Sequence, residues 1–375
     1  MPSKGITDDG DQETGGLNMA DGTDGTSLDS SIPTHLRCPR SRHRRVSDSW
    51  KPPYPAFSAL VDPAIEQIVM AYFGVQAKGD EMKGPLCAAF QKIRQTLTLT
   101  DGPARHDLVQ FLDAEGYLNL IVVAYWQDPK KHLNWSNSPE VAGWWNSDDR
   151  LHEGVGYFRE VLSPRMEQFE TIFTHDYGPF EGVSILFGNM SQPIFEHGYW
   201  GSMRDRLPVS QNDTMEPTGK LTVTQGQPKA GGRVVISGHQ NLTLIRSGED
   251  WSRTKDEERR VWYEDIEPVL HQGMNFLRDD GLEVGCYTNR YCHHMDEHGN
   301  LQEKGFGVSL WNSLADLEHW GESHPTHLQI FVTFMRNVHK FKDLTLYHEV
   351  SVFDASNQYF EYINCHPKTG VLRAV

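Results

Sequence analysis

Apolar and polar positions along the chain predict alternating strands and helices from about residue 52 onward. In the first half, the pattern predicts a strand at residues 67–75, a helix at about 85–96, a strand at 118–126 and a helix-like stretch at 139–146. Strands and helices mixed in this way are typical of an α+β protein.

The same order of elements recurs in the second half. The pattern predicts a strand at 233–246, a helix at about 255–277, a strand near 306–311, a helix from Leu314 and a last strand at 344–353. The apolar residues of the 255–277 helix fall mostly on one face, and they are Val261, Ile266, Val269, Leu270 and Phe276.

Two such passes predict an α+β fold of tandem ferredoxin-like repeats, whose sheets can pack together and leave one internal cavity. We expect a first half at 46–215 and a second half at 216–375, after a tail at 1–45. Residues 1 to about 33 are mostly Gly, Asp, Ser and Thr, which cannot bury enough apolar surface to offset the entropy of ordering. This stretch is therefore expected to be disordered.

Five arginines follow between Arg37 and Arg45. They can be interpreted as a targeting signal, or as a basic segment that lies on the acidic body of the same protein or of a partner subunit. Transit peptides are poor in acidic residues, whereas this tail carries seven before Ser30, so we favour the second interpretation.

Composition excludes several classes of function. The chain has 375 residues, 38% of them hydrophobic, which is enough for a large core. Its net charge of −16 disfavours binding to nucleic acid or to an anionic membrane.

The five cysteines lack paired CxxC spacing, and the apolar runs are too short to span a bilayer. We expect a soluble, cytoplasmic protein without a disulfide framework or a zinc site, and we interpret Cys286, Cys292, His293 and His294 as a strand end and loop.

The stretch ESHPTHLQIF at residues 322–331 contains a candidate metal ligand. Pro325 suits the first position of a helix, with His324 or Ser323 as its cap. His327 then lies in the first turn and shares a face with Phe331, so its imidazole can point into an apolar cavity and bind haem iron. On this motif alone, a satisfied core or surface histidine is the more common role.

A second candidate lies in the strand predicted at 344–353. Alternation places His348 on the same face as Leu344, Leu346, Val350 and Val352. A histidine on an apolar face is usually a hydrogen-bonded core residue, but in a dry pocket it can also transfer a proton near neutral pH.

Two further polar residues, Arg206 and Ser247, lie beside apolar runs rich in glycine and tryptophan. At strand or loop ends such residues can bind anions, cap helices or form ion pairs, and each taken singly is structural by default.

Five segments, taken together and in order, resemble the haem-containing aldoxime dehydratase family, including phenylacetaldoxime dehydratases. The resemblance covers roughly residues 35–370. The segments are GYFREVLSPRMEQFET at 156–171, EHGYWGSMRDRLPVSQ at 196–211, GHQNLTLIRSGEDW at 238–251, ESHPTHLQIF at 322–331 and LYHEVSVFDA at 346–355.

The resemblance implies a lyase that removes water from an aldoxime, R–CH=N–OH, to give a nitrile. It further implies haem b, active in the ferrous state, that binds the oxime nitrogen directly, and a homodimer with an α+β-barrel fold similar to chlorite dismutase. His327 falls on the proximal haem ligand, His348 on the distal catalytic histidine, and Arg206 and Ser247 on residues that contact the substrate hydroxyl. Glu170 is a possible match to a further acidic residue.

Two alternatives to this reading of the function stay open. A haem peroxidase or chlorite-dismutase-like enzyme would use a similar fold and a distal arginine. A non-catalytic haem-binding protein would need the iron ligand alone.

Overall fold

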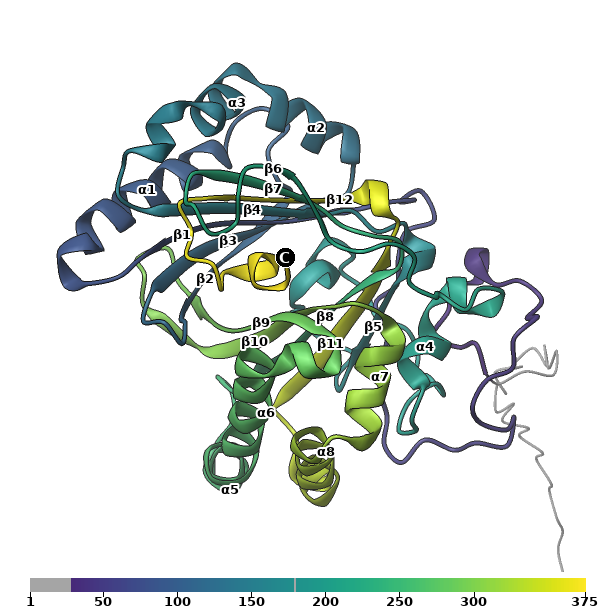
Figure 1. Cartoon of the computed structure of the whole chain (residues 1–375). Coiled ribbons are helices and arrows are strands. Elements are labelled where there is room, and N and C mark those ends of the chain that lie inside the picture. Colours follow the sequence, from purple (N-terminus) through teal and green to yellow (C-terminus); the bar gives the residue numbers. More distant parts are fainter. Residues whose placement is uncertain (1–27, 179) are drawn as a thin grey trace, which may run out of the picture.

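The computed structural model of the chain describes residues 28–178 and 180–375, so most of the tail expected to be disordered lies outside the described residues (Figure 1). The described chain contains mixed strands and helices, which confirms the predicted α+β class. The first half consists of β1 (Val69–Ala77), α1 (Lys83–Thr96), β2 (Arg105–Leu112), β3 (Leu118–Trp126), α2 (Pro129–Asn137), α3 (Pro139–Asn146) and β4 (Gly156–Leu162).

The second half repeats this order with longer helices. Its elements are β8 (Leu242–Asp250), α5 (Asp256–Val261), a π-helical turn at Trp262–Ile266, α6 (Glu267–Asp279), β9 (Cys286–Met295), β10 (Leu301–Trp311), α7 (Leu314–Ser323), α8 (Pro325–Asn337) and β11 (Thr345–Phe353). Between and after the halves lie β5 (Phe169–Phe173), α4 (Ser202–Arg206), β6 (Thr222–Gln225), β7 (Arg233–Ser237) and β12 (Gln358–Ile363).

The strands form one antiparallel sheet in the order β5-β11-β8-β10-β9-β2-β3-β1-β4-β12-β7-β6. In each half the four strands lie in the order fourth, first, third, second. The halves meet where β2 pairs with β9, from Leu108 opposite Met295 to Gln110 opposite His293. β5 comes from the first half of the chain but pairs with β11, and β12 comes from the C-terminal end but pairs with β4. Each half of the sheet therefore includes a strand from the other half of the chain.

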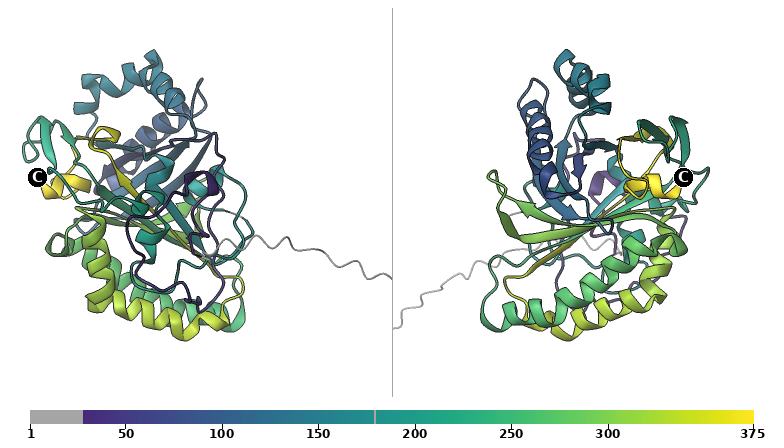
Figure 2. Two further views of the ribbon diagram at one scale, coloured as in Figure 1. Left: turned by 90° about the vertical axis from the view of Figure 1, so that its right-hand side faces the viewer. Right: turned by 60° about the vertical axis from the view of Figure 1, so that its left-hand side comes forward.

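The buried apolar residues form clusters on the inner faces of the sheet and beneath the helices on each outer face. Helices α1–α3 cover the outer face of the first half of the sheet, and α6–α8 cover the outer face of the second (Figures 1 and 2). The inner faces pack against each other through side chains such as Phe158, Phe306 and Phe353, all of which are buried. The cavity described below lies between one half of the sheet and its helices, whereas buried apolar side chains occupy the space between the inner faces.

The sequence pattern also merged two strands into one. Residues 233–246 were predicted as a single strand, but the chain turns at residues 238–241, where Asn241 has a φ of 60°. β7 then pairs with β12, whereas β8 pairs with β10 and β11. An apolar run on both sides of a short turn carries no periodic signal that distinguishes two strands from one.

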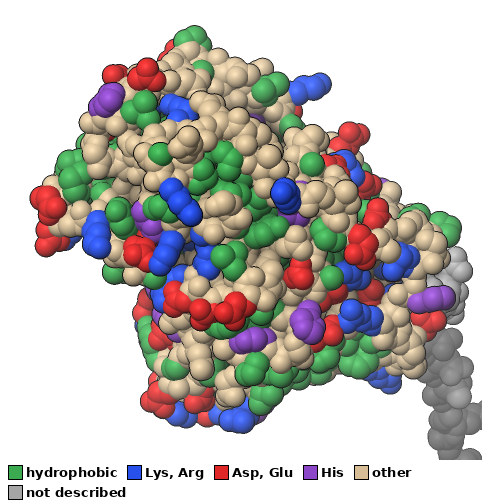
Figure 3. Space-filling view, in the orientation of Figure 1, with side chains coloured by type: hydrophobic (Ala, Val, Ile, Leu, Met, Phe, Trp, Pro, Cys, Tyr) green, Lys and Arg blue, Asp and Glu red, His purple; other side chains and the backbone are tan. Residues whose placement is uncertain are grey.

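The arginine-rich segment packs onto the same chain. Arg40 lies 2.7 Å from Asp29, and the guanidinium of Arg45 contacts the carboxylates of Glu318 and Glu322 on α7. Acidic and basic side chains are interspersed on the face shown in Figure 3. The segment thus lies on acidic groups of the body, as we favoured. Within the described residues, no helix combines the length and apolarity that crossing a membrane requires.

A buried ion pair connects the two halves. Both terminal nitrogens of Arg290, on β9, lie 2.6 Å from the carboxylate oxygens of Glu160, on β4. The Tyr362 hydroxyl donates a further hydrogen bond of 2.6 Å to the same carboxylate. Because both charged side chains are almost fully buried, each depends on the other for compensation.

We expect Arg290→Met to lower the free energy of unfolding by about 3–5 kcal/mol, because it leaves the buried Glu160 carboxylate without its counter-charge. Urea unfolding followed by fluorescence measures this as a lower midpoint. The matched control is Arg260→Met, since the pair of Arg260 with Glu264 is exposed and its loss should shift the midpoint little. Equal midpoints for the two variants would contradict the role of the Arg290–Glu160 pair.

Candidate functional site

A cavity of about 320 Å³ lies between the outer face of β8, β10 and β11 and the helices α6, α7 and α8. Most of its lining is apolar or aromatic, with a few polar groups that converge on it. This combination is typical of a cofactor or small-molecule site. All four residues that the sequence singled out line the cavity, and they are Arg206, Ser247, His327 and His348.

His327 reaches the cavity from the first turn of α8. The helix begins as predicted, with Pro325 at its first position and His324 as the cap whose side chain accepts a hydrogen bond from the Thr326 amide. The Nδ1 atom of His327 lies 2.7 Å from the carbonyl oxygen of Gly321. Since a carbonyl only accepts, Nδ1 carries the proton and Nε2 keeps a lone pair. Burial lowers the pKa of His327, which favours this neutral form.

Ser247 and His348 lie side by side on the sheet that forms another wall. They are direct cross-strand partners in the β8–β11 pair. The predicted alternation along β11 holds, since Leu346 and His348 line the cavity and Val350 and Val352 join the apolar cluster on the same side. In the described part of the chain, the Ser247 hydroxyl makes no hydrogen bond to another residue. It is therefore available to a molecule in the cavity.

Arg206 ends the short helix α4 and is held by a buried carboxylate. Its Nε lies 2.6 Å from one oxygen of Glu170, on β5, and the side chains of both residues are only 1% exposed. Its Nη1 donates to the carbonyl of Glu196 at 2.7 Å, and its Nη2 lies 2.6 Å from Nε2 of His348. Arg206 thus contacts the imidazole directly and has little freedom to reorient.

Nε2 of His348 contacts one hydrogen-bond donor and one acceptor, which favour different protonation states of the ring. Arg206 only donates, so it requires the lone pair of a neutral imidazole, whereas Glu170, 3.2 Å away, accepts from a protonated one. Burial is the largest effect and lowers the pKa of His348, while Glu170 raises this pKa and Arg206 lowers it. The site can therefore hold His348 in either protonation state, which a proton-transferring group requires.

The rest of the cavity wall carries three further carboxyl groups, of which Glu318 and Glu322 are paired with Arg204 and Arg45. Burial raises the pKa of Glu249, two residues beyond Ser247 on β8, to about 8, although Tyr291 donates a hydrogen bond to it. Glu249 is therefore mostly a neutral acid at pH 7. Charge in the wall near Ser247 is then concentrated in the Arg206–Glu170 pair, which strengthens its effect in this apolar surrounding.

His197 also lines the cavity, although the sequence analysis assigned it no role. His197 is 1% exposed, its ring lies 4.9 Å from that of Tyr54, and neither ring nitrogen has a hydrogen-bond partner within the described residues. Burial lowers its pKa to about 4, so it is neutral. Buried polar atoms are rarely left unpaired, so a molecule in the cavity is expected to bond to it. Its sequence neighbourhood offered no periodic signal to single it out.

The opposite face of the same strands carries a separate network of charges. Arg246 and Glu349 are neighbours of Ser247 and His348 in sequence, but they point to the interior between the halves. Arg246 lies 3.2 Å from Asp107, on β2. Arg246 also donates a hydrogen bond of 3.0 Å to the hydroxyl of Tyr347, a residue that lines the cavity, so this network meets the cavity at β8 and β11.

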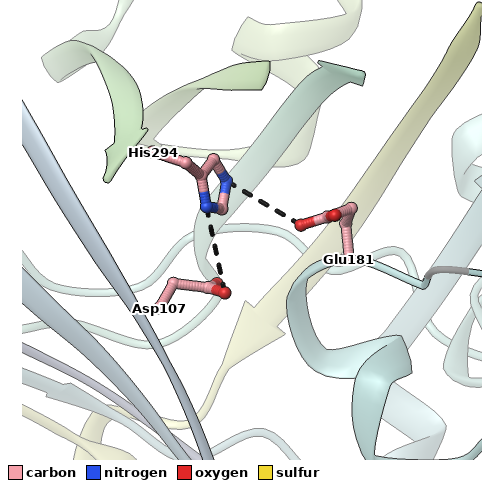
Figure 4. Close-up of side chains that lie close together, drawn as sticks. All are labelled: Asp107, Glu181 and His294. Carbon is pink, nitrogen blue, oxygen red and sulfur yellow. Dashed lines mark ion pairs between the residues drawn. The ribbon is translucent and has the colours of Figure 1, made fainter. Parts of the chain in front are cut away.

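Asp107, Glu181 and His294 lie close together in this network, near enough to raise the question of a metal ion (Figure 4). However, Asp107 faces Nδ1 of His294 at 4.0 Å and Glu181 faces Nε2 at 3.8 Å, so the two carboxylates address different ring nitrogens. Asp107 is also paired with Arg246, and Glu181 lies 3.0 Å from Lys304. A histidine binds a metal ion through one ring nitrogen, and the other ligands must reach the ion at that nitrogen. We therefore interpret the cluster as part of the structural network.

Comparison with known proteins gives consistent matches. The model of the family described as haem-containing dehydratase matches residues 71–371. An aliphatic aldoxime dehydratase from a Pseudomonas species is 51% identical over 346 residues, 92% of this chain and 98% of that protein. A phenylacetaldoxime dehydratase from Bacillus sp. strain OxB-1 is 32% identical and covers 88% of this chain and 94% of its own. A crystal structure of an aldoxime dehydratase with butyraldoxime is 48% identical, covers 92% of this chain and 96% of its own, and superimposes with a TM-score of 0.90.

We expect Glu170→Gln to lower the pKa of His348, because it removes the anion that stabilises the protonated imidazole while Arg206 remains. NMR titration of the histidine ring signals, assigned with a His348→Ala variant, measures this pKa. The matched control is Glu167→Gln, since Glu167 lies at the surface three residues away. An unchanged or higher pKa in Glu170→Gln would show that Glu170 does not control this proton.

Proposed function

The chain belongs to the haem-containing dehydratase family, and from that premise we propose that it converts aldoximes, R–CH=N–OH, to nitriles and water with haem b as cofactor. The observation that carries this proposal is the placement of His327 on the α8 wall of one cavity that also presents Ser247, Arg206 and His348. Relatives that match most of the chain are named for this activity.

The residues of the cavity fit a haem group. Iron-binding histidines usually donate their second ring N–H to a carbonyl, and His327 does so toward Gly321 while its Nε2 stays free. The lining is mostly apolar, which suits the macrocycle, and the unpaired nitrogens of His197 offer a hydrogen bond to a polar edge of a bound group. His327 would bind the iron, and side chains of α6 and α8 would surround the ring.

The reaction breaks the N–O bond and removes the proton on the carbon. Held by His327, a haem group would supply a ferrous iron able to bind the oxime and to donate electron density into its C=N–O group. The leaving hydroxide is poor unless it is protonated, so a residue of the chain must deliver a proton to the oxygen and accept one from the carbon.

His348 is the residue placed for both transfers. In its protonated form it gives the proton at its ring nitrogen to the departing hydroxyl, which leaves as water. The neutral imidazole then takes the proton from the carbon, and the nitrile forms. The atoms balance and His348 returns to its starting state, while Glu170 stabilises the charged form between turnovers.

Ser247 and Arg206 stabilise the oxime oxygen as it departs. The free hydroxyl of Ser247 donates a hydrogen bond to the oxime oxygen from the position beside His348. Arg206 positions His348 through Nε2 and favours negative charge on the departing oxygen. Fixed donors of this kind are typically worth about 2.7–4 kcal/mol in a site that excludes water.

The substrate class follows from the relatives. Those that are about half identical to this chain are named aliphatic aldoxime dehydratases, whereas the phenylacetaldoxime dehydratase is 32% identical. We therefore propose that alkyl aldoximes are the better substrates. The apolar lining of the cavity is compatible with an alkyl chain.

Three features of the assembly belong to the same proposal. We infer that each half is a ferredoxin-like unit, since both run β-α-β-β-α-β with the strand order fourth, first, third, second. We propose a homodimer on the strength of the family resemblance. A cytoplasmic location is supported by five cysteines that all remain as free thiols.

We predict that the haem-loaded, dithionite-reduced protein forms butyronitrile from butyraldoxime under anaerobic conditions, and does so faster than it forms phenylacetonitrile from phenylacetaldoxime. Gas chromatography measures the nitriles. The ferric protein is the control and should be much less active. Haem binding without nitrile would favour a carrier, and peroxide turnover by the ferric form without nitrile from the ferrous form would favour the peroxidase or chlorite-dismutase-like alternative.

We predict that His348→Ala retains haem but loses dehydration by about a hundred- to ten-thousandfold, because it removes the group that transfers both protons. The Soret band measures haem content and nitrile formation measures activity. His327→Ala is the matched control, since it should instead lose the iron ligand and change the Soret band. A His348→Ala enzyme with full haem and much of the wild-type rate would eliminate the proposed role.

A further inference from the structure

A second cavity, of about 420 Å³, lies in the first half of the molecule. It is bounded by the outer face of β1, β4 and β12 on one side and by helices α1, α2 and α3 on the other. Figure 1 shows these helices on the side of the molecule opposite α5–α8. The proposed haem site therefore does not include this cavity.

The second cavity occupies the same place in its half as the haem cavity does in the other. In the second half, Ser247 and His348 are cross-strand partners on the first and fourth strands, and they face the helices. In the first half, Phe73 and Arg159 are among the partners on the first and fourth strands that face the helices. Arg159, a side chain able to bind a ligand, thus lies on the strand face that corresponds to the face of His348 in the other half.

The walls of this cavity are aromatic and fixed. Trp135 and Trp145 are 2% and 3% exposed, and their indole nitrogens donate to the Thr96 carbonyl at 2.8 Å and to Glu361 at 2.5 Å. Their rings lie 5.4 and 5.9 Å from that of Phe73. Mostly apolar walls with a few fixed polar groups are typical of small-molecule sites.

The charge of this cavity is positive. The carboxylate of Glu361 is shared by two guanidinium groups, those of Arg159, whose Nε is 2.5 Å away, and Arg233. One positive charge therefore remains without a counter-charge in this partly buried group. A cation in the cavity would be repelled, whereas an anion would neutralise the excess.

Arg159 lines the cavity and is held in place by aromatic side chains. Its guanidinium carbon lies 5.2 Å from the Trp145 ring and 5.1 Å from the Tyr359 ring, so it is held between two aromatic side chains. Besides the ion pair of its Nε with Glu361, its one further polar contact among the described residues is a long one of 3.4 Å from Nη2 to the Tyr359 hydroxyl. Donors of its planar fork thus remain available, and this fork matches a carboxylate. The imidazole of His132, in the same wall, is kept neutral by burial and by Arg159, which lower its pKa to about 4.

We propose that this cavity binds a small organic carboxylate with an apolar body, with the carboxylate at Arg159 and the body between the tryptophans. The site is separate from aldoxime dehydration and does not depend on it. Its ligand class is set by the uncompensated guanidinium charge and by the aromatic walls.

Equilibrium dialysis of the haem-loaded protein against radiolabelled hexanoate tests the proposal, with 1-hexanol as the neutral probe of equal chain length. We expect saturable binding of hexanoate at one site per chain, much weaker binding of hexanol and an unchanged Soret band. Absence of hexanoate binding up to about 10 mM would overturn the proposal.

Two variants locate the binding. Arg159→Gln should weaken hexanoate binding about tenfold or more, since it removes the charged donor but leaves Arg233 to compensate Glu361. Ala142→Trp, in the wall formed by α3, should abolish binding by filling the cavity while it keeps Arg159. Both variants should keep haem content and dehydration near wild type, which verifies the fold. Unweakened hexanoate binding in both variants, or binding that shifts the Soret band, would place the hexanoate elsewhere and overturn the proposal.

Discussion

The alternation of side chains along β8 and β11 constrains the rest of the molecule. The pair Ser247 and His348 faces the cavity, while the next pair, Arg246 and Glu349, faces the interior between the halves. A slip of one residue in either strand would exchange a neutral hydroxyl or imidazole for a buried charge. Because Arg246 finds partners on β2 and β3, contacts on the face opposite the cavity help to fix the register of β8 and β11.

The arrangement around His348 also depends on the ion pair of Arg206 with Glu170, whose residues come from segments distant in sequence. Glu170 on β5 holds Arg206 on α4, and both reach His348 on β11. The competition of a donor and an acceptor for one ring nitrogen keeps both protonation states of the imidazole accessible. Such a buried pair is costly to break, so the geometry around His348 resists thermal fluctuation more than a surface pair would.

Much of the fold and of the candidate site could be predicted from the sequence, whereas two strands and one cavity residue could not. The strand at 118–126 and the helix at 139–146 matched residue for residue, because the first is one apolar run of strand length and the second begins with a Ser-Pro cap. β2 and β9 were not predicted, since they carry Asp107, Arg290 and His294 inward, where the pattern leads one to expect apolar residues. His327 and His348 were placed from helix and strand geometry, whereas His197 gave no signal, because its burial results from contacts with residues far away along the chain, such as Tyr54.

The exchange of strands between the halves has a consequence for biosynthesis. β5 can complete its pairing only with β11, and β4 only with β12, so the sheet cannot close until almost the whole chain has left the ribosome. Contacts this distant in sequence form slowly, and a first half made alone would expose unpaired strand edges to other nascent chains. We therefore expect haem capture to be a late, post-translational event, and truncation near the C-terminus to yield aggregated protein rather than a smaller functional unit.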